Sequence, residues 1–75
     1  MRPIHEVAAE IRKVWNKPYF GAVPYIEAMM CLSDKNDRYI CDSATDIVLR
    51  FLGNANTWRG EDARRIKKEL KDIIA

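Results

Sequence analysis

Apolar residues recur at helical spacing along the start of the chain. Six of them are separated by three, one, three, three and one positions: Ile4, Val7, Ala8, Ile11, Val14 and Trp15. Because an α-helix turns by 100° per residue, this spacing gathers them on one face and predicts an amphipathic helix over residues 3–16. Pro3 suits a first helical position, and Pro18 disfavours helical geometry at the residue before it. Such a face has to be buried against other helices.

Three later segments of the chain also have apolar residues at helical spacing. Further helices are expected over residues 24–32, 43–53 and 61–74. Their inward apolar residues are expected to be Ile26, Met29, Met30, Cys31, Ala44, Ile47, Val48, Leu49, Phe51, Leu52, Ala63, Ile66, Leu70, Ile73 and Ile74. A chain of 75 residues holds one domain at most. The sequence therefore predicts an all-α fold, a compact irregular bundle of four helices in a single domain over residues 1–75.

Two helix termini have capping signals. Ser43 precedes Asp46 by three positions, which resembles a capping box with Asp in place of the usual Glu. Gly60, or Thr57 if the last helix starts earlier, is the expected N-cap of that helix. Glu61 and Asp62 follow Gly60, where the helix dipole favours negative charge. These signals support the predicted starts of the third and fourth helices.

The connections between the helices are rich in aromatic residues. Tyr19 and Phe20 lie in the link PYFGAV and are too apolar for a purely solvated loop, so we expect them to close one end of the core. Trp58 and Arg59 lie just before the last helix, and both residue types are enriched at binding hot spots. Tyr19, Phe20, Trp58 and Arg59 are therefore the candidate anchors for a protein partner. The alternative for Trp58 is that its ring folds back over the core.

The longest irregular stretch, residues 33–42, is acidic. A calcium-binding loop starting at Asp34 would need an oxygen ligand at its fifth position, Gly at its sixth and Glu at its twelfth. The sequence has Arg38, Tyr39 and Thr45 at these positions. An acidic turn without a metal is the expected structure.

The sequence contains no recognisable catalytic or metal-binding motif. Cys31 and Cys41 are the only cysteines, and we expect Cys31 to be a small buried hydrophobic residue, with a Cys31–Cys41 disulfide as the alternative. Two cysteines and the single histidine, His5, cannot complete a zinc site without carboxylates. No nucleophile has an orienting partner at an informative spacing, and the glycines are isolated. We therefore expect a protein that is not an enzyme and needs no cofactor or metal.

The last helix has a stripe of basic residues. Two pairs are spaced for ion pairs along the helix, Glu61 with Arg65 and Lys68 with Asp72, and Glu69 can also reach Arg65. The basic residues that form the stripe or adjoin it are Arg59, Arg64, Lys67, Lys68 and Lys71. Such a stripe can follow the phosphate backbone of DNA or RNA, and the alternative is a solvated helix face. The formal net charge of +2 is too small to decide between these alternatives.

Nothing in the sequence indicates a membrane segment. No apolar run approaches the ~20 residues that span a bilayer, and the N-terminal region lacks the apolar centre of a signal peptide. A cytoplasmic protein is expected.

Three stretches resemble short helical proteins encoded by phages and prophages. They are RPIHEVAAEIR near the N-terminus, PYFGAVPYIEAM over residues 18–29 and SATDIVLRFLGNANTWRGEDARRIKKEL over residues 43–70. These proteins have no assigned activity, so the resemblance implies no site residue. It implies a setting in the host cytoplasm, where small phage proteins bind host proteins or nucleic acid more often than they catalyse reactions.

These observations favour a small protein–protein interaction module. The alternative is non-specific nucleic-acid binding through the basic stripe. A third hypothesis is a homodimer or small homo-oligomer, if the apolar faces of the first and last helices exceed what a core of this size can hide.

Overall fold

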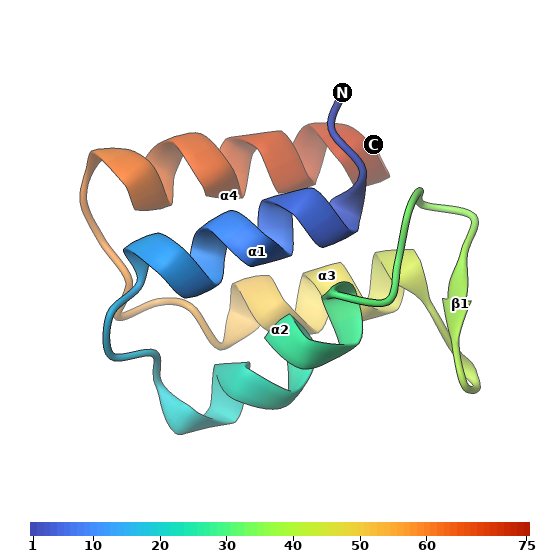
Figure 1. Cartoon of the computed structure of the whole chain (residues 1–75), viewed down its shortest axis with the longest axis horizontal. Coiled ribbons are helices and arrows are strands. Elements are labelled where there is room, and N and C mark those ends of the chain that lie inside the picture. Colours follow the sequence, from blue (N-terminus) through green and yellow to red (C-terminus); the bar gives the residue numbers. More distant parts are fainter.

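Four α-helices and one small hairpin form the computed structural model, which describes residues 1–75 (Figure 1). The α-helices are α1 (Ile4–Val14), α2 (Val23–Met29), α3 (Ala44–Gly53) and α4 (Glu61–Ile74). A 3₁₀ turn, η1 (Phe20–Ala22), precedes α2, and strands β1 (Arg38–Tyr39) and β2 (Asp42–Ser43) precede α3. The predicted all-α fold class is confirmed, with the hairpin as a small addition.

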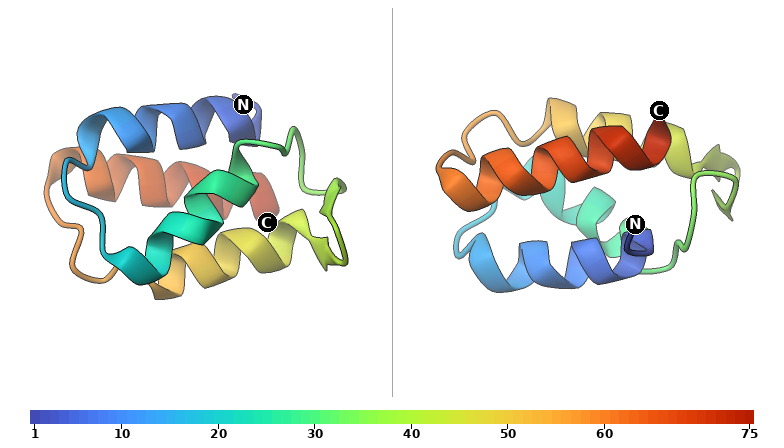
Figure 2. Two further views of the ribbon diagram at one scale, coloured as in Figure 1. Left: turned by 60° about the horizontal axis from the view of Figure 1, so that its bottom comes forward. Right: turned by 90° about the horizontal axis from the view of Figure 1, so that it is seen from above.

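The four helices surround one core. α1 packs on α2 and α4, and α3 packs on the same two helices from the other side. Both chain termini lie at one end of the bundle, whereas the α1–α2 and α3–α4 connections lie together at the opposite end (Figures 1 and 2). No helix has the length and apolar character needed to cross a bilayer.

The predicted apolar faces account for most of the core. The buried residues of the helices are Ile4, Val7, Ala8, Ile11, Ile26, Ala28, Met29, Ala44, Ile47, Val48, Phe51, Ala63, Ile66, Leu70 and Ile73. Near the end formed by the two connections, the rings of Trp15 and Trp58 stack with centroids 5.1 Å apart. The ring of Phe51 meets both indoles edge-on, at 6.2 Å from Trp15 and 6.4 Å from Trp58. The apolar faces of α1 and α4 are thus buried within a single chain, which removes the reason given above for self-association.

The helix bounds differ from the predicted ones mainly at C-termini. α1 ends at Val14 because Trp15 already has extended backbone geometry. α2 ends at Met29. The Cys31 N–H then bonds to the carbonyl of Ala28, three residues back, where an α-helix would use the residue four back, and this turns the chain out of the helix. α4 has the predicted bounds. α3 starts one residue late because Ser43 is its N-cap.

Three residues predicted to face the core lie outside it. Met30 and Cys31 are exposed because α2 has ended before them, and both cysteines are free. Leu49 is 53% exposed because it is two positions from the buried residues Ile47 and Phe51, which places it about 200° around the helix.

The stretch predicted to be irregular contains an antiparallel hairpin. Arg38 pairs with Ser43 and Tyr39 with Asp42, so that Ile40 and Cys41 form the tip. Ile40 has a φ of 58° and is 84% exposed. Two-residue hairpin tips need positive φ and usually contain Gly, Asn or Asp, so a β-branched residue gives no sequence signal for one.

A network of ion pairs joins the N-terminal residues to α1 and α4. Arg2 and Arg65 both approach the carboxylate of Glu10 at 2.7 Å. Arg2 also forms a two-bond pair with Glu69, at 2.7 and 3.0 Å, and Arg65 reaches Asp62 at 3.1 Å. The predicted pairing of Arg65 with Glu61 and Glu69 is wrong, because a neighbouring helix and the N-terminal segment supply better-placed partners.

Acid is expected to weaken the fold through Glu10. Its hydrogen bonds to Arg65 and then to Arg2 lower the pKa of the carboxyl group from 4.5 to about 2. The folded state therefore binds this proton less tightly than the unfolded chain, so the stabilisation is complete above pH 4.5 and is lost towards pH 2. Because water screens partly exposed pairs, we expect a loss of about 1 kcal/mol from this site. Urea unfolding across this range should show a flatter pH dependence for Glu10→Gln than for the wild type, and equal slopes would contradict the assignment.

Candidate functional site

The two aromatic connections form one continuous end of the molecule. Residues 15–22 join α1 to α2, and residues 54–60 join α3 to α4 (Figure 2). The stacked rings of Trp15 and Trp58 hold the two connections together. We call this region, with the adjoining ends of α1, α2 and α4, the link end.

Trp58 is an internal residue of the link end. It is only 5% exposed, and its ring lies between Trp15 and Lys67. The Lys67 ammonium donates hydrogen bonds to the carbonyl oxygens of Ala55 and Trp58, both at 2.7 Å. Trp58 is therefore not available as an anchor for a partner in this structure, and its placement matches the alternative in which the ring covers the core.

Tyr19 and Phe20 are the exposed aromatic residues of the link end. Phe20 is 79% exposed and Tyr19 is 44% exposed, and their ring centroids are 4.8 Å apart. The expectation that they close the core is wrong, because Trp15, Ala22 and Trp58 already occupy that position. The two rings form a surface pair, which we call the aromatic pair.

The backbone beneath the aromatic pair is closely packed. The Ala22 N–H donates to the Tyr19 carbonyl at 2.8 Å, which closes the η1 turn. A Cβ atom at Gly21 would lie 2.6 Å from the Tyr19 ring and 2.9 Å from the Asn54 side-chain oxygen. Only glycine permits this approach without moving a neighbour, so the link is held against the α3–α4 connection.

The predicted basic stripe of α4 is partly neutralised. Lys68 pairs with Asp72 at 3.1 Å, as its spacing predicts. Lys67 is bound to carbonyl oxygens, and desolvation, followed by the charges of Lys71 and Arg59, lowers its pKa. Arg59, Arg64 and Lys71 remain exposed and form no ion pair.

Further basic residues, which were not among the predicted site residues, lie at the link end. Arg12, Lys13 and Lys17 are exposed at the end of α1 and in the following link, and none of them forms an ion pair. Arg59 and Arg64 are further unpaired cations of the link end, but the cations lie in separate places: Lys13 lines a hollow with Arg2 and Glu10, and Arg59 and Arg64 line another beside Trp58. Arg12 and Lys13 lie in the last turn of α1, where positive charge suits the helix dipole, so in the sequence they have an ordinary structural explanation.

A small cleft opens beside the aromatic pair, between the end of α1 and the start of α2. Its volume is about 200 Å³. The residues that line it are Arg12, Trp15, Asn16, Pro18, Val23, Ile26 and Glu27. Trp15 and Ile26 are buried, so the base of the cleft is apolar and its rim is charged.

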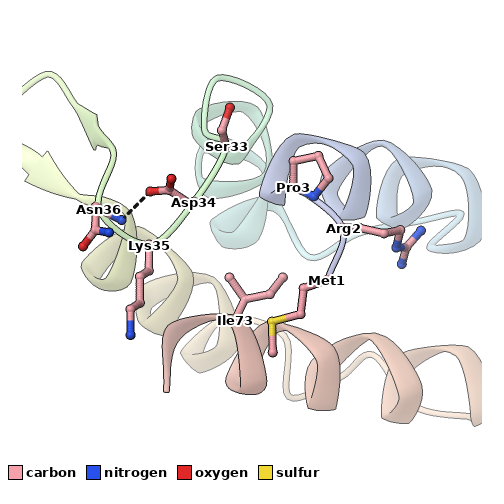
Figure 3. Close-up of a pocket in the computed structure, with 8 residues that line it drawn as sticks. All are labelled: Met1, Arg2, Pro3, Ser33, Asp34, Lys35, Asn36 and Ile73. Atoms are coloured by element: carbon pink, nitrogen blue, oxygen red, sulfur yellow. Dashed lines mark hydrogen bonds between the residues drawn. The ribbon is translucent and has the colours of Figure 1, made fainter.

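A larger cleft of about 450 Å³ lies at the opposite end of the bundle, between the N-terminal residues, the loop after α2 and the end of α4 (Figure 3). Its charged side chains already have partners, and Asp34 accepts a hydrogen bond from the Asn36 N–H at 2.8 Å. Arg2 turns away from the cleft towards Glu69, and the Lys35 ammonium donates to the Ala75 carbonyl at 2.7 Å. No three His, Cys, Asp or Glu side chains gather to hold a metal ion there or elsewhere.

Comparison with known protein families, with curated protein sequences and with solved structures finds no match. The resemblance to phage and prophage proteins therefore stays a prediction. The link end is defined by its geometry alone: an exposed aromatic pair, unpaired positive charge and an adjoining cleft with an apolar base.

Proposed function

We propose that the protein is an interaction module that binds another protein through its link end. The observation that carries this proposal is the aromatic pair, in which Phe20 is 79% exposed and in contact with Tyr19. Aromatic residues are enriched in the buried centres of protein interfaces, where few side chains supply most of the binding free energy. An exposed Phe on a closely packed support offers this contact with little conformational entropy to lose.

The surroundings of the pair support a protein partner. Interfaces combine an apolar centre with a polar rim. Here the exposed, unpaired Lys17 lies two residues before Tyr19, and the polar residues Asn54, Asn56 and Thr57 line a hollow together with Tyr19. Trp58, a predicted anchor, has no part in this proposal, and Arg59, the other anchor predicted in this connection, is exposed.

Substituting Phe20 is expected to weaken partner retention strongly. The wild-type protein, Phe20→Ala and the matched surface control Leu49→Ala would each be immobilised and incubated with a cell lysate. The proteins that each one retains would then be compared by quantitative mass spectrometry. Since loss of a central aromatic contact costs about 2 kcal/mol or more, retention should fall by roughly 30-fold with Phe20→Ala and stay unchanged with Leu49→Ala. Because both side chains are exposed, neither variant should change the unfolding midpoint. Equal retention by Phe20→Ala and the wild type would refute the proposal.

Nucleic-acid binding is a second candidate function. It is favoured by Arg59, Arg64 and Lys71, which stay exposed and unpaired on or beside α4. Three phosphate contacts predict that log affinity falls with log salt concentration with a slope of roughly −2 to −3. Fluorescence anisotropy with labelled DNA and RNA across a salt series measures this slope. Absence of binding at low salt would eliminate the candidate.

A further inference from the structure

We infer that the cleft between α1 and α2 receives one large apolar side chain from an acidic segment of the partner protein, which rests on the function proposed above. This inference names the chemistry of the partner. It follows from the size of the cleft, its position beside the aromatic pair and the charges at its rim.

The size of the cleft fits a single side chain. Its volume of about 200 Å³ lies below the roughly 300–1,000 Å³ of pockets that hold drug-sized ligands or cofactors. A buried cavity of about 150 Å³ can hold benzene, so a Leu, Met or Phe side chain is an appropriate occupant. The buried side chains of Trp15 and Ile26, with Val23 and Pro18, supply apolar contacts.

The position of the cleft lets one extended segment contact both features. Pro18 lines the cleft and directly precedes the aromatic pair, and Val23 lines it three residues after Phe20. A segment that packs on Phe20 therefore needs to extend only a short distance to place a side chain between α1 and α2.

The charges at the rim select an acidic segment. Arg12 lines the cleft and is unpaired, and the unpaired Lys17 directly precedes Pro18 of the lining. Glu27 is the one acidic residue of the lining, and it forms no ion pair. Carboxylates on either side of the inserted side chain would pair with Arg12 and Lys17, while Glu27 can accept a backbone N–H. The apolar base disfavours a phosphate backbone in this position, because a phosphate would lose its hydration there.

The experiment begins with a random peptide display library selected on the immobilised full chain. The expected consensus is one Leu, Met or Phe flanked by Asp or Glu. Replacing that apolar residue by Ala in a synthetic selected peptide should weaken binding at least tenfold. Val23→Arg, which fills the cleft, should have the same effect. The matched control Leu49→Arg, which makes the same kind of change on the exposed face of α3, should bind like the wild type.

Nuclear magnetic resonance locates the bound peptide. The expected result is chemical-shift changes at the Trp15 indole and at the methyl groups of Val23 and Ile26, together with the rings of Tyr19 and Phe20. Shifts confined to the aromatic pair would overturn the cleft inference and leave the proposed function standing. Failure to select any peptide, or a consensus without acidic residues, would also overturn it. So would a single-stranded thymidine oligonucleotide that produces the same shifts, since the occupant would then be nucleic acid.

Discussion

Phe51→Ala is expected to bring the protein close to its unfolding threshold at room temperature. Phe51 is fully buried and packs edge-on against both tryptophans, so the substitution leaves a cavity at the centre of the aromatic cluster. Truncating a buried Phe typically costs about 3–5 kcal/mol. At roughly 0.05–0.15 kcal/mol per residue, a chain of 75 residues has a total stability of about 4–11 kcal/mol. The substitution therefore removes a large fraction of the total.

Thermal and urea unfolding, followed by far-ultraviolet circular dichroism and by tryptophan fluorescence, measure this loss. For a domain of this size we expect Tm to fall by roughly 15 °C or more. Phe51→Leu, which keeps most of the volume, should cost about 1.5 kcal/mol or less, and Leu49→Ala on the exposed face of the same helix should cost less than about 0.5 kcal/mol. A Phe51→Ala variant as stable as Leu49→Ala would show that the aromatic cluster is not the centre of the core.

The same glycine-to-alanine change is expected to have opposite effects at Gly60 and Gly53. Gly60 has a φ of 113° and a ψ of −177°, a backbone region that is open essentially only to glycine. Alanine there has free space around its Cβ but a strained backbone, so Gly60→Ala should cost about 1–3 kcal/mol. Gly53 is the last residue of α3, has ordinary φ and also has free space, so Gly53→Ala should stabilise by about 0.4–1 kcal/mol.

Urea unfolding of both variants tests this contrast directly, because the chemical change is identical and neither site has a steric clash. The difference between the two variants should be about 1.5 kcal/mol or more. If both variants were equally stable, the α3–α4 connection could not have the backbone geometry at Gly60 that turns the chain into α4. The aromatic contact between Trp15 and Trp58 would then need another explanation.

The starts of the helices could be predicted closely because their signals are local. The Ser43 side chain accepts a hydrogen bond from the Asp46 N–H at 3.1 Å, and Gly60 directly precedes α4, as the sequence predicts. The end of α2 could not be predicted in this way. MMCL is apolar throughout, so periodicity alone gives no reason for Met29 to be buried and for Met30 and Cys31 to be exposed.

The candidate site was predicted only in part. Tyr19, Phe20 and Arg59 were selected by residue type and lie on the surface of the link end. Trp58 was selected for the same reason and is buried. Residue type could not separate these cases, because a Trp and a Phe in adjacent connections compete for the same place at the end of the core. The ring that stacks on Trp15 becomes internal, and the pair in the η1 turn stays outside.

The amphipathic spacing by itself determined that the chain forms four helices and which face of α1 and α4 is buried. This follows because helical periodicity depends only on residues within a few positions of one another. The tertiary structure alone decided that Arg65 pairs with Glu10, that Lys67 is held by carbonyl groups, and that Arg12 borders an apolar cleft. These contacts depend on which helices meet and at which end, and that arrangement comes from packing the four apolar faces into one core.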